Sequence, residues 1–116
     1  MPIVSRIVVD HARRTLVCEL LVPHDLPIFH GHFPAVPIVP GVTQVGWAVE
    51  LVRQHGIAAG RCSGIVTAKF RRLVLPGMRL MARIEADPGA GQCQFTFELA
   101  GAAVSTGRLQ FGAGHD

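Results

Sequence analysis

The chain has 116 residues, of which 49% are apolar and only 16% are charged, and its formal net charge is +3. This length fits a single domain, residues 1–116, and excludes a second one. The charge is too small for a nucleic-acid-binding surface, and three prolines interrupt the longest uncharged stretch, 31–49, which excludes a membrane span. We therefore expect neither nucleic acid nor membrane among the partners.

The N-terminus and the cysteines indicate a cytoplasmic protein. No basic segment followed by a long apolar segment opens the chain, so no secretory signal is visible. Cys18, Cys62 and Cys93 are widely spaced and form no C-x-x-C pair, which argues against a disulfide framework and a zinc knuckle. We expect three reduced thiols in the core, and we expect self-association to cover apolar surface.

Alternating apolar and polar residues predict antiparallel strands toward both ends of the chain. Residues 3–9 and 15–22 flank a hairpin connection, and 63–69 form a strand before a turn at 76–77. A meander of strands follows over 79–87, 93–99 and 102–111.

Residues 41–55 break this alternation and predict the one long helix. Its apolar residues recur at helical spacing: Val42, Val45, Ala48, Val49 and Val52. Pro40 before the helix and Gly56 after it suit its two ends. Because the helix is apolar on nearly every side, we expect protein to enclose it. The predicted class is α+β, with a long central helix wrapped by a strongly twisted antiparallel sheet.

Two segments resemble a known family: "GHFPAVPIVPGV" (31–42) and "KFRRLVLPGMRL" (69–80). Together they resemble the hotdog-fold 3-hydroxyacyl-[acyl-carrier-protein] dehydratases of fatty acid synthesis. Within that family, the segment "PGVTQVGWA" (40–48) looks more like a branch linked to aryl polyene pigment synthesis. The resemblance implies a hotdog fold and the reversible loss of water from a 3-hydroxyacyl thioester, which gives the trans-2-enoyl thioester.

The same resemblance implies the partners. The substrate is carried on the phosphopantetheine of acyl carrier protein or of coenzyme A, and no other cofactor is expected. The family forms homodimers, or higher oligomers of dimers, in which the two helices pack together and each active site is assembled across the interface. A heterodimer with another hotdog protein stays open.

The resemblance assigns catalytic roles to His32 and Gly41. His32 matches the family's histidine, which removes the proton next to the thioester carbonyl, a task that suits an imidazole with a pKa of about 6.5. Gly41 matches the glycine at the helix start, whose backbone N–H points at the thioester oxygen. Two simpler alternatives stay open: a histidine bonded to a loop backbone, and a glycine needed only for the turn.

The chain departs from the family at Gly46, where the family has an Asp or Glu that protonates the leaving hydroxyl. Loss of a general acid typically costs about 10²–10⁴-fold in rate. Glu50, one turn later on nearly the same face, is the candidate replacement. Its alternative is a side chain that faces solvent or pairs with Arg53. Gln44 could orient the substrate hydroxyl or a water, but a neutral amide is a poor proton donor.

Other residues are expected to bind substrate or carrier. The expected substrate-binding residues are Gly31, Phe33, Pro40, Val42, Gln44, Gly46, Trp47 and Phe70, although the sequence does not separate core aromatics from those that line an acyl tunnel. Lys69, Arg71 and Arg72 are expected to contact the acidic carrier protein or its phosphate, or else form a solvated face. No metal is expected at His24, His30 and His32, because no carboxylate or cysteine completes that set.

Three functions remain in competition. The first is an active dehydratase with an unusual acid. The second is a non-catalytic acyl-binding protein, or the inactive half of a heterodimer whose other chain supplies the acid. The third is an acyl thioesterase, which the missing helix carboxylate also weakens.

Overall fold

The computed structural model describes residues 1–30 and 37–112. Within these ranges the chain forms a six-stranded sheet and one long helix, α1 (Gly41–His55). The strands are β1 (Ile3–Asp10), β2 (Thr15–Leu21), β3 (Arg61–Phe70), β4 (Arg79–Asp87), β5 (Gln92–Leu99) and β6 (Ala102–Gly112). A short 3₁₀ helix, η1 (Pro27–His30), follows β2. The predicted α+β class is confirmed.

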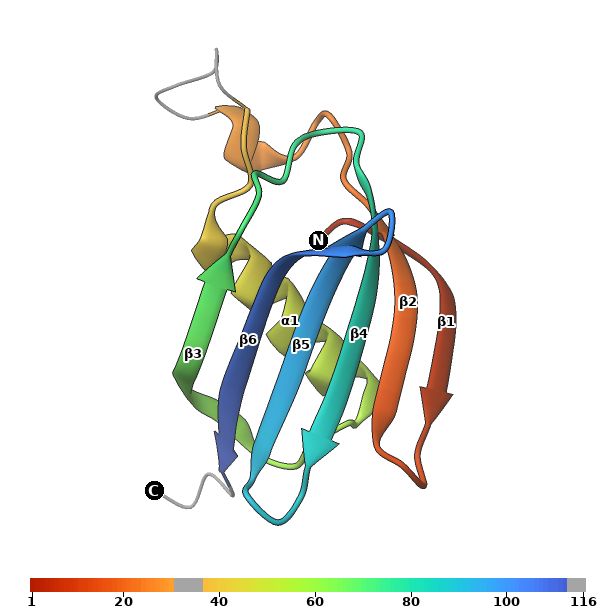
Figure 1. Cartoon of the computed structure of the whole chain (residues 1–116), viewed down its shortest axis with the longest axis vertical. Helices are drawn as coiled ribbons and strands as arrows, with labels where there is room; N and C mark the ends of the chain where they lie inside the picture. Colours follow the sequence, from red (N-terminus) through yellow and green to blue (C-terminus); the bar gives the residue numbers. More distant parts are fainter. Residues whose placement is uncertain (31–36, 113–116) are drawn as a thin grey trace.

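The strands are arranged in the order β1-β2-β4-β5-β6-β3, and every neighbouring pair is antiparallel. Figure 1 shows α1 crossing one face of this sheet, behind β6, β5 and β4. The N-terminal end of α1 lies beside the C-terminal end of β3, which brings two segments separated in sequence to the same end of the molecule. Those are the two segments that carry the family resemblance.

The core lies between α1 and the face of the sheet that the helix covers. Trp47, Ala48, Leu51 and Val52 of α1 belong to one buried apolar cluster with the inward-facing residues of the strands. Strand alternation explains this, because successive side chains point to opposite faces of the sheet. In β5, for example, Cys93, Phe95 and Phe97 are buried, while Gln94 between them is exposed.

The sheet covers α1 on one side and leaves a stripe of the helix open. Four of its residues, each about one helical turn after the one before, are not covered by the sheet. They are Val42, Gly46, Glu50 and Arg53, which we call the outer stripe. Val42 is 77% exposed, and a side chain added at Gly46 would have open space around its Cβ. The sequence predicts protein on almost every side of the helix; the sheet supplies that cover on one side, and the outer stripe is open in the single chain.

Both outer strands of the sheet leave one edge unpaired. β1 and β3 occupy these edges, and β3 exposes the large apolar side chains Ile65, Val66 and Phe70. Edge strands with exposed apolar residues are ready to pair with another chain. The expected self-association therefore has a surface available on β3.

The cysteines are free, and two of the three lie in the core as predicted. Burial raises the pKa of the Cys18 thiol to about 11. The pKa of Cys93 rises to about 11 for the same reason, with a smaller contribution from Cys62. Cys62 is only half-buried, because it lies on the edge strand β3 rather than in the centre of the sheet. No helix within the described ranges is both long enough and apolar enough to cross a membrane.

Candidate active site at the start of helix α1

The position of the first turn of α1 is fixed through Val39. The N–H of Val39 donates to the carbonyl of Val74 at 2.8 Å, and the Nε2 of Gln44 donates to the carbonyl of Val39 at 3.1 Å. Pro40 follows in an extended conformation, and its carbonyl accepts the first bonds of the helix, from Thr43 and Gln44. The chain therefore enters the helix in a defined direction, tied on one side to the segment after β3.

The first turn of α1 offers unpaired donors. The N–H groups of Gly41 and Val42 have no acceptor among the described residues, and no side chain caps this end of the helix. The first N–H groups of a helix point along its axis and carry the positive end of the helix dipole. Such groups can stabilise an oxygen that gains negative charge.

Gly41 borders a hollow of about 300 Å³, which we call the entrance hollow. Its lining residues are Ile38, Val39, Pro40, Gly41, Gln44, Phe70, Arg71, Arg72 and Leu73. The lining is mostly apolar, with two arginines and one amide but no carboxylate among the described residues. This lining suits an apolar chain beside a charged group, and none of the described residues in it is a proton-donating acid.

Gly41 allows a close contact between the start of α1 and the side chain of Phe70. A Cβ at this residue would lie 2.8 Å from the Cε2 and Cζ atoms of the Phe70 ring. The alternative in which Gly41 serves only the turn into the helix is therefore incomplete. The glycine also lets the ring of Phe70, at the end of β3, lie against the helix. Phe70 is partly exposed and closes one side of the entrance hollow.

Gln44 is the only buried polar residue of the lining. Its side chain is 2% exposed, and its Oε1 has no hydrogen-bond partner among the described residues. The sequence suggests that Gln44 orients the substrate hydroxyl or a water, but no sequence signal shows that its Oε1 is buried without a donor among the described residues.

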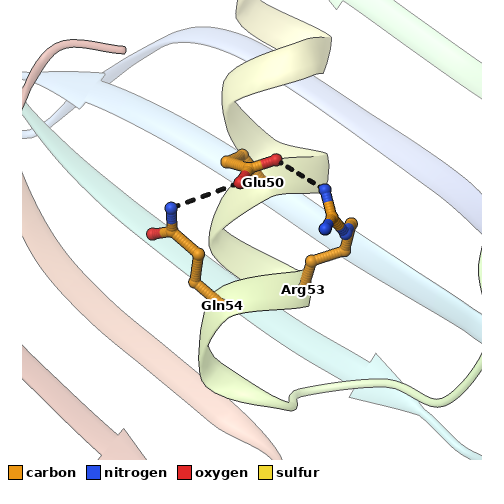
Figure 2. A network of polar contacts seen from close by, with 3 residues as sticks. All are labelled: Glu50, Arg53 and Gln54. Carbon is orange, nitrogen blue, oxygen red and sulfur yellow. Dashed lines mark hydrogen bonds and ion pairs between the residues drawn. The ribbon is translucent and has the colours of Figure 1, made fainter.

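Gly46 and Glu50 lie away from the entrance hollow. The two oxygens of the Glu50 carboxylate accept hydrogen bonds from Arg53 Nη1 at 3.0 Å and from Gln54 Nε2 at 3.2 Å (Figure 2). The Glu50 side chain is 33% exposed and lies in the outer stripe, so the structure matches the pairing with Arg53 that the sequence left open. No acidic residue stands in the first turn of α1. Glu50 is thus not brought to the entrance hollow, and its role as the acid has no support from the geometry of this chain.

The remaining predicted site residues divide into three groups. Pro40 lines the entrance hollow beside Gly41, Val42 lies in the outer stripe, and Trp47 is buried in the core. Gly31, His32 and Phe33 lie outside the described residues, so the predicted base stays a prediction. No cluster of three metal-ligating side chains occurs in the part of the chain that the structure describes. Ile38, Val39 and Leu73 were missed because single apolar residues in a loop carry no signal of lining a pocket.

Three basic residues lie at the end of β3 and just after it, and two of them, Arg71 and Arg72, line the entrance hollow. Lys69 lies near the end of β3, and Arg71 and Arg72 follow it, all three exposed. The backbone N–H groups of Arg71 and Arg72 both donate to the carbonyl of Val104, at 2.8 and 3.3 Å. This shared contact fixes the backbone from which the two guanidinium groups reach into solvent, beside the opening.

Comparison with known proteins gives a consistent family. The family profile described as "ApeI-like: ApeI dehydratase" matches residues 8–108. The 3-hydroxyacyl-[acyl-carrier-protein] dehydratase FabZ of Anaeromyxobacter dehalogenans is 34% identical over 99 residues, which cover 77% of this chain and 64% of that protein. The FabZ dehydratase of Roseiflexus castenholzii is 32% identical, with 94% of this chain and 83% of that protein covered. The chain therefore spans a little under two thirds of the Anaeromyxobacter relative.

Two solved structures share the fold over nearly the whole chain. The dehydratase heterocomplex ApeI:P from Xenorhabdus doucetiae matches with a TM-score of 0.86 and 26% identity, covering 95% of this chain and 96% of that one. An uncharacterized protein from Erwinia carotovora subsp. atroseptica matches with a TM-score of 0.85, 24% identity and coverage of 97% and 96%. The predicted hotdog architecture is confirmed.

The two glycines of α1 give a matched pair of substitutions. Gly41→Ala should lower the free energy of unfolding by about 1 kcal/mol, because the new Cβ displaces the Phe70 ring. Gly46→Ala should raise it by up to about 1 kcal/mol, because alanine is the better helix former and meets no neighbour within 4 Å. Urea denaturation measures both, and the Gly41→Ala penalty should vanish in a Phe70→Ala background. Equal effects of the two alanines would contradict the packing described for Gly41.

Proposed function

The chain belongs to the ApeI-like dehydratase family, and from this premise we propose that it removes water from a 3-hydroxyacyl thioester carried on phosphopantetheine. The product is the trans-2-enoyl thioester, and the pathway is fatty acid or polyene-type biosynthesis. The observation that carries the proposal is the N–H of Gly41, which has no acceptor among the described residues and borders a largely apolar hollow with two arginines in its lining.

The proposed reaction begins with the thioester carbonyl at Gly41. His32 takes a proton from C2 of the substrate, and the electron pair moves toward the carbonyl oxygen. The N–H of Gly41, at the positive end of the helix, stabilises the developing negative charge there. The electron pair then forms the C2–C3 double bond while the C3–O bond breaks, and the hydroxyl leaves as water once it has received a proton.

That last proton needs an acid, and we propose that a second hotdog chain supplies it. The entrance hollow contains no carboxylate among the described residues, and Gly46 lies in the outer stripe, where the helix is open to a partner. In a homodimer that packs helix against helix, each chain would bring Gly46 to the active site of the other, so both sites would receive a glycine. A related partner with Asp or Glu at this position would instead bring a carboxyl to the active site of this chain. The similar structure from Xenorhabdus doucetiae is itself a heterocomplex.

The partner surface proposed here combines the outer stripe with the free edge of β3. Val42 on the helix and Ile65 and Val66 on the strand are exposed apolar residues of this single chain. Burying apolar surface of this kind stabilises association by roughly 25 cal/mol per Å² before the entropic costs of binding.

A second candidate function is binding without catalysis. The lack of a carboxylate in the entrance hollow favours an acyl-binding subunit whose partner carries out the reaction. The two candidates agree on the ligand and differ only in whether His32 of this chain takes part in turnover.

The proposed function is tested by assaying the chain alone and mixed with a hotdog dehydratase subunit that carries the helix carboxylate. With 3-hydroxyacyl carrier protein as substrate, mass spectrometry should show the enoyl product from the mixture, at least about 100-fold faster than from this chain alone. His32→Ala in this chain should abolish the gain. A gain that survives His32→Ala would favour the non-catalytic subunit, and release of free thiol with no enoyl product would show a thioesterase instead.

The basic residues beside the entrance hollow should select the carrier. We expect the double variant Arg71→Glu and Arg72→Glu to raise the KM for carrier-bound substrate by roughly tenfold, because two repulsive charges then face an acidic protein. The KM for the same acyl group on pantetheine alone should change little. Arg61→Glu, at the far end of β3, is the matched control. An equal rise in KM for both substrates would contradict a carrier contact, and loss of the effect at high salt would agree with one.

A further inference from the structure

The side-chain amide of Gln44 has a defined orientation. Its nitrogen must be the atom that faces the carbonyl of Val39, 3.1 Å away, because the opposite orientation would place two oxygens together with no proton between them. The Oε1 atom is therefore the end left over. It is buried, and no described residue donates to it.

A buried acceptor without a donor is unfavourable, typically at a cost equivalent to about 5-fold or more in an equilibrium constant. Native proteins keep few such groups, and each one calls for an explanation, such as a catalytic role or a bound water or ion. Gln44 lines the entrance hollow together with Gly41, which stands three residues earlier, about one helical turn away. Gln44, which carries the oxygen without a described donor, thus lines the same hollow as Gly41, and the oxygen itself lies buried behind that lining.

We propose that Gln44 Oε1 accepts a hydrogen bond from the C3 hydroxyl of the substrate, so that the entrance hollow distinguishes the hydroxyacyl thioester from the enoyl product. This inference rests on the proposed function and adds the group that recognises the hydroxyl. A 3-hydroxyacyl chain has one strong hydrogen-bond donor, and that donor lies two carbons from the thioester carbonyl. With the carbonyl oxygen on the N–H of Gly41, a residue one turn along the helix is suitably placed to receive it.

The contact suits the chemistry of elimination. A hydroxyl that donates its proton to Oε1 keeps its own lone pairs free, and those lone pairs receive the proton from the acid when the C3–O bond breaks. Gln44 therefore positions the leaving group and supplies no proton itself. The enoyl product has lost the donor, so its binding leaves Oε1 unpaired again, and this favours product release over retention.

The test compares two ligands that differ only in the hydroxyl. A 3-hydroxyacyl chain and a saturated acyl chain of equal length, each joined to pantetheine by an amide in place of the thioester, are titrated into the protein by calorimetry. We expect the wild-type protein to bind the hydroxyacyl ligand about tenfold more tightly, the size of one hydrogen bond to a buried acceptor. In Gln44→Met, which keeps the length of the side chain but removes both polar atoms, the ratio of the two affinities should fall to about one.

Ser105→Ala is the matched control. Ser105 Oγ is also buried and has no partner among the described residues, but it does not line the entrance hollow. Its removal should leave the ratio near ten, whereas a lower ratio would point to a general effect of losing a buried polar atom and overturn the assignment to Gln44.

A second readout does not depend on the stability of Gln44→Met. The side-chain amide resonances of Gln44 in the ¹⁵N-labelled wild-type protein should shift with the hydroxyacyl ligand and not with the saturated one. Equal affinities of the wild-type protein for the two ligands would overturn the inference and leave the proposed function intact. A shift of the Gln44 amide resonances with both ligands would do the same, because the pantetheine arm that both ligands share would then be the hydrogen-bond donor. Failure of both ligands to bind would instead overturn the proposed function.

Discussion

The packing of one face of α1 against the sheet is the interaction on which the rest of the structure depends. Trp47, Ala48, Leu51 and Val52 are buried there, and burying each large apolar side chain contributes about 1.5–3 kcal/mol. Because a helix has a fixed period, this choice of buried face also decides what faces outward. It places Gln44 toward the core and Gly46 in the outer stripe, two residues apart in sequence but on opposite sides of the helix.

The first turn of that helix is held by a second constraint, at Val39. The bonds of Val39 to Val74 and to Gln44 join the start of α1 to the segment that follows β3. The two segments that share the family resemblance therefore meet in one hollow. The hollow has backbone donors for a carbonyl, a buried acceptor and two exposed arginines, but no acid among the described residues. In the proposed reaction it binds and orients a thioester, and no described residue of its lining can donate the proton that an elimination needs.

Much of the fold could be predicted from the sequence, because most strands are amphipathic. The alternation in 79–87 gave the bounds of β4, and the helical spacing in 41–55 gave those of α1. β3 was predicted as 63–69 and runs over Arg61–Phe70, because an exposed edge strand has no clear alternation of buried and exposed residues. η1 was not predicted, since four residues are too few to show a period.

The candidate site was less predictable, for physical reasons that differ between residues. Gly41 and the arginines were found from the motifs, whereas the ring of Phe70 against Gly41 is a contact between distant segments that no local pattern contains. An apolar helix gives no indication of which face another molecule covers, so the exposure of Gly46 was missed. The pairing of Glu50 with Arg53 depends on that same choice of face.

The central claim is that a homodimer of this chain assembles sites that lack only one carboxyl, which position 46 of the partner copy would supply. The most direct measurement is the dehydration rate of the Gly46→Asp variant acting alone on a 3-hydroxyacyl thioester. A side chain fits there, since nothing lies within 4 Å of the added Cβ. The account predicts a rate at least about 100-fold above that of the wild-type chain alone, which should persist when Glu50→Gln is added. An unchanged rate in a folded Gly46→Asp protein that still binds the substrate would contradict the claim.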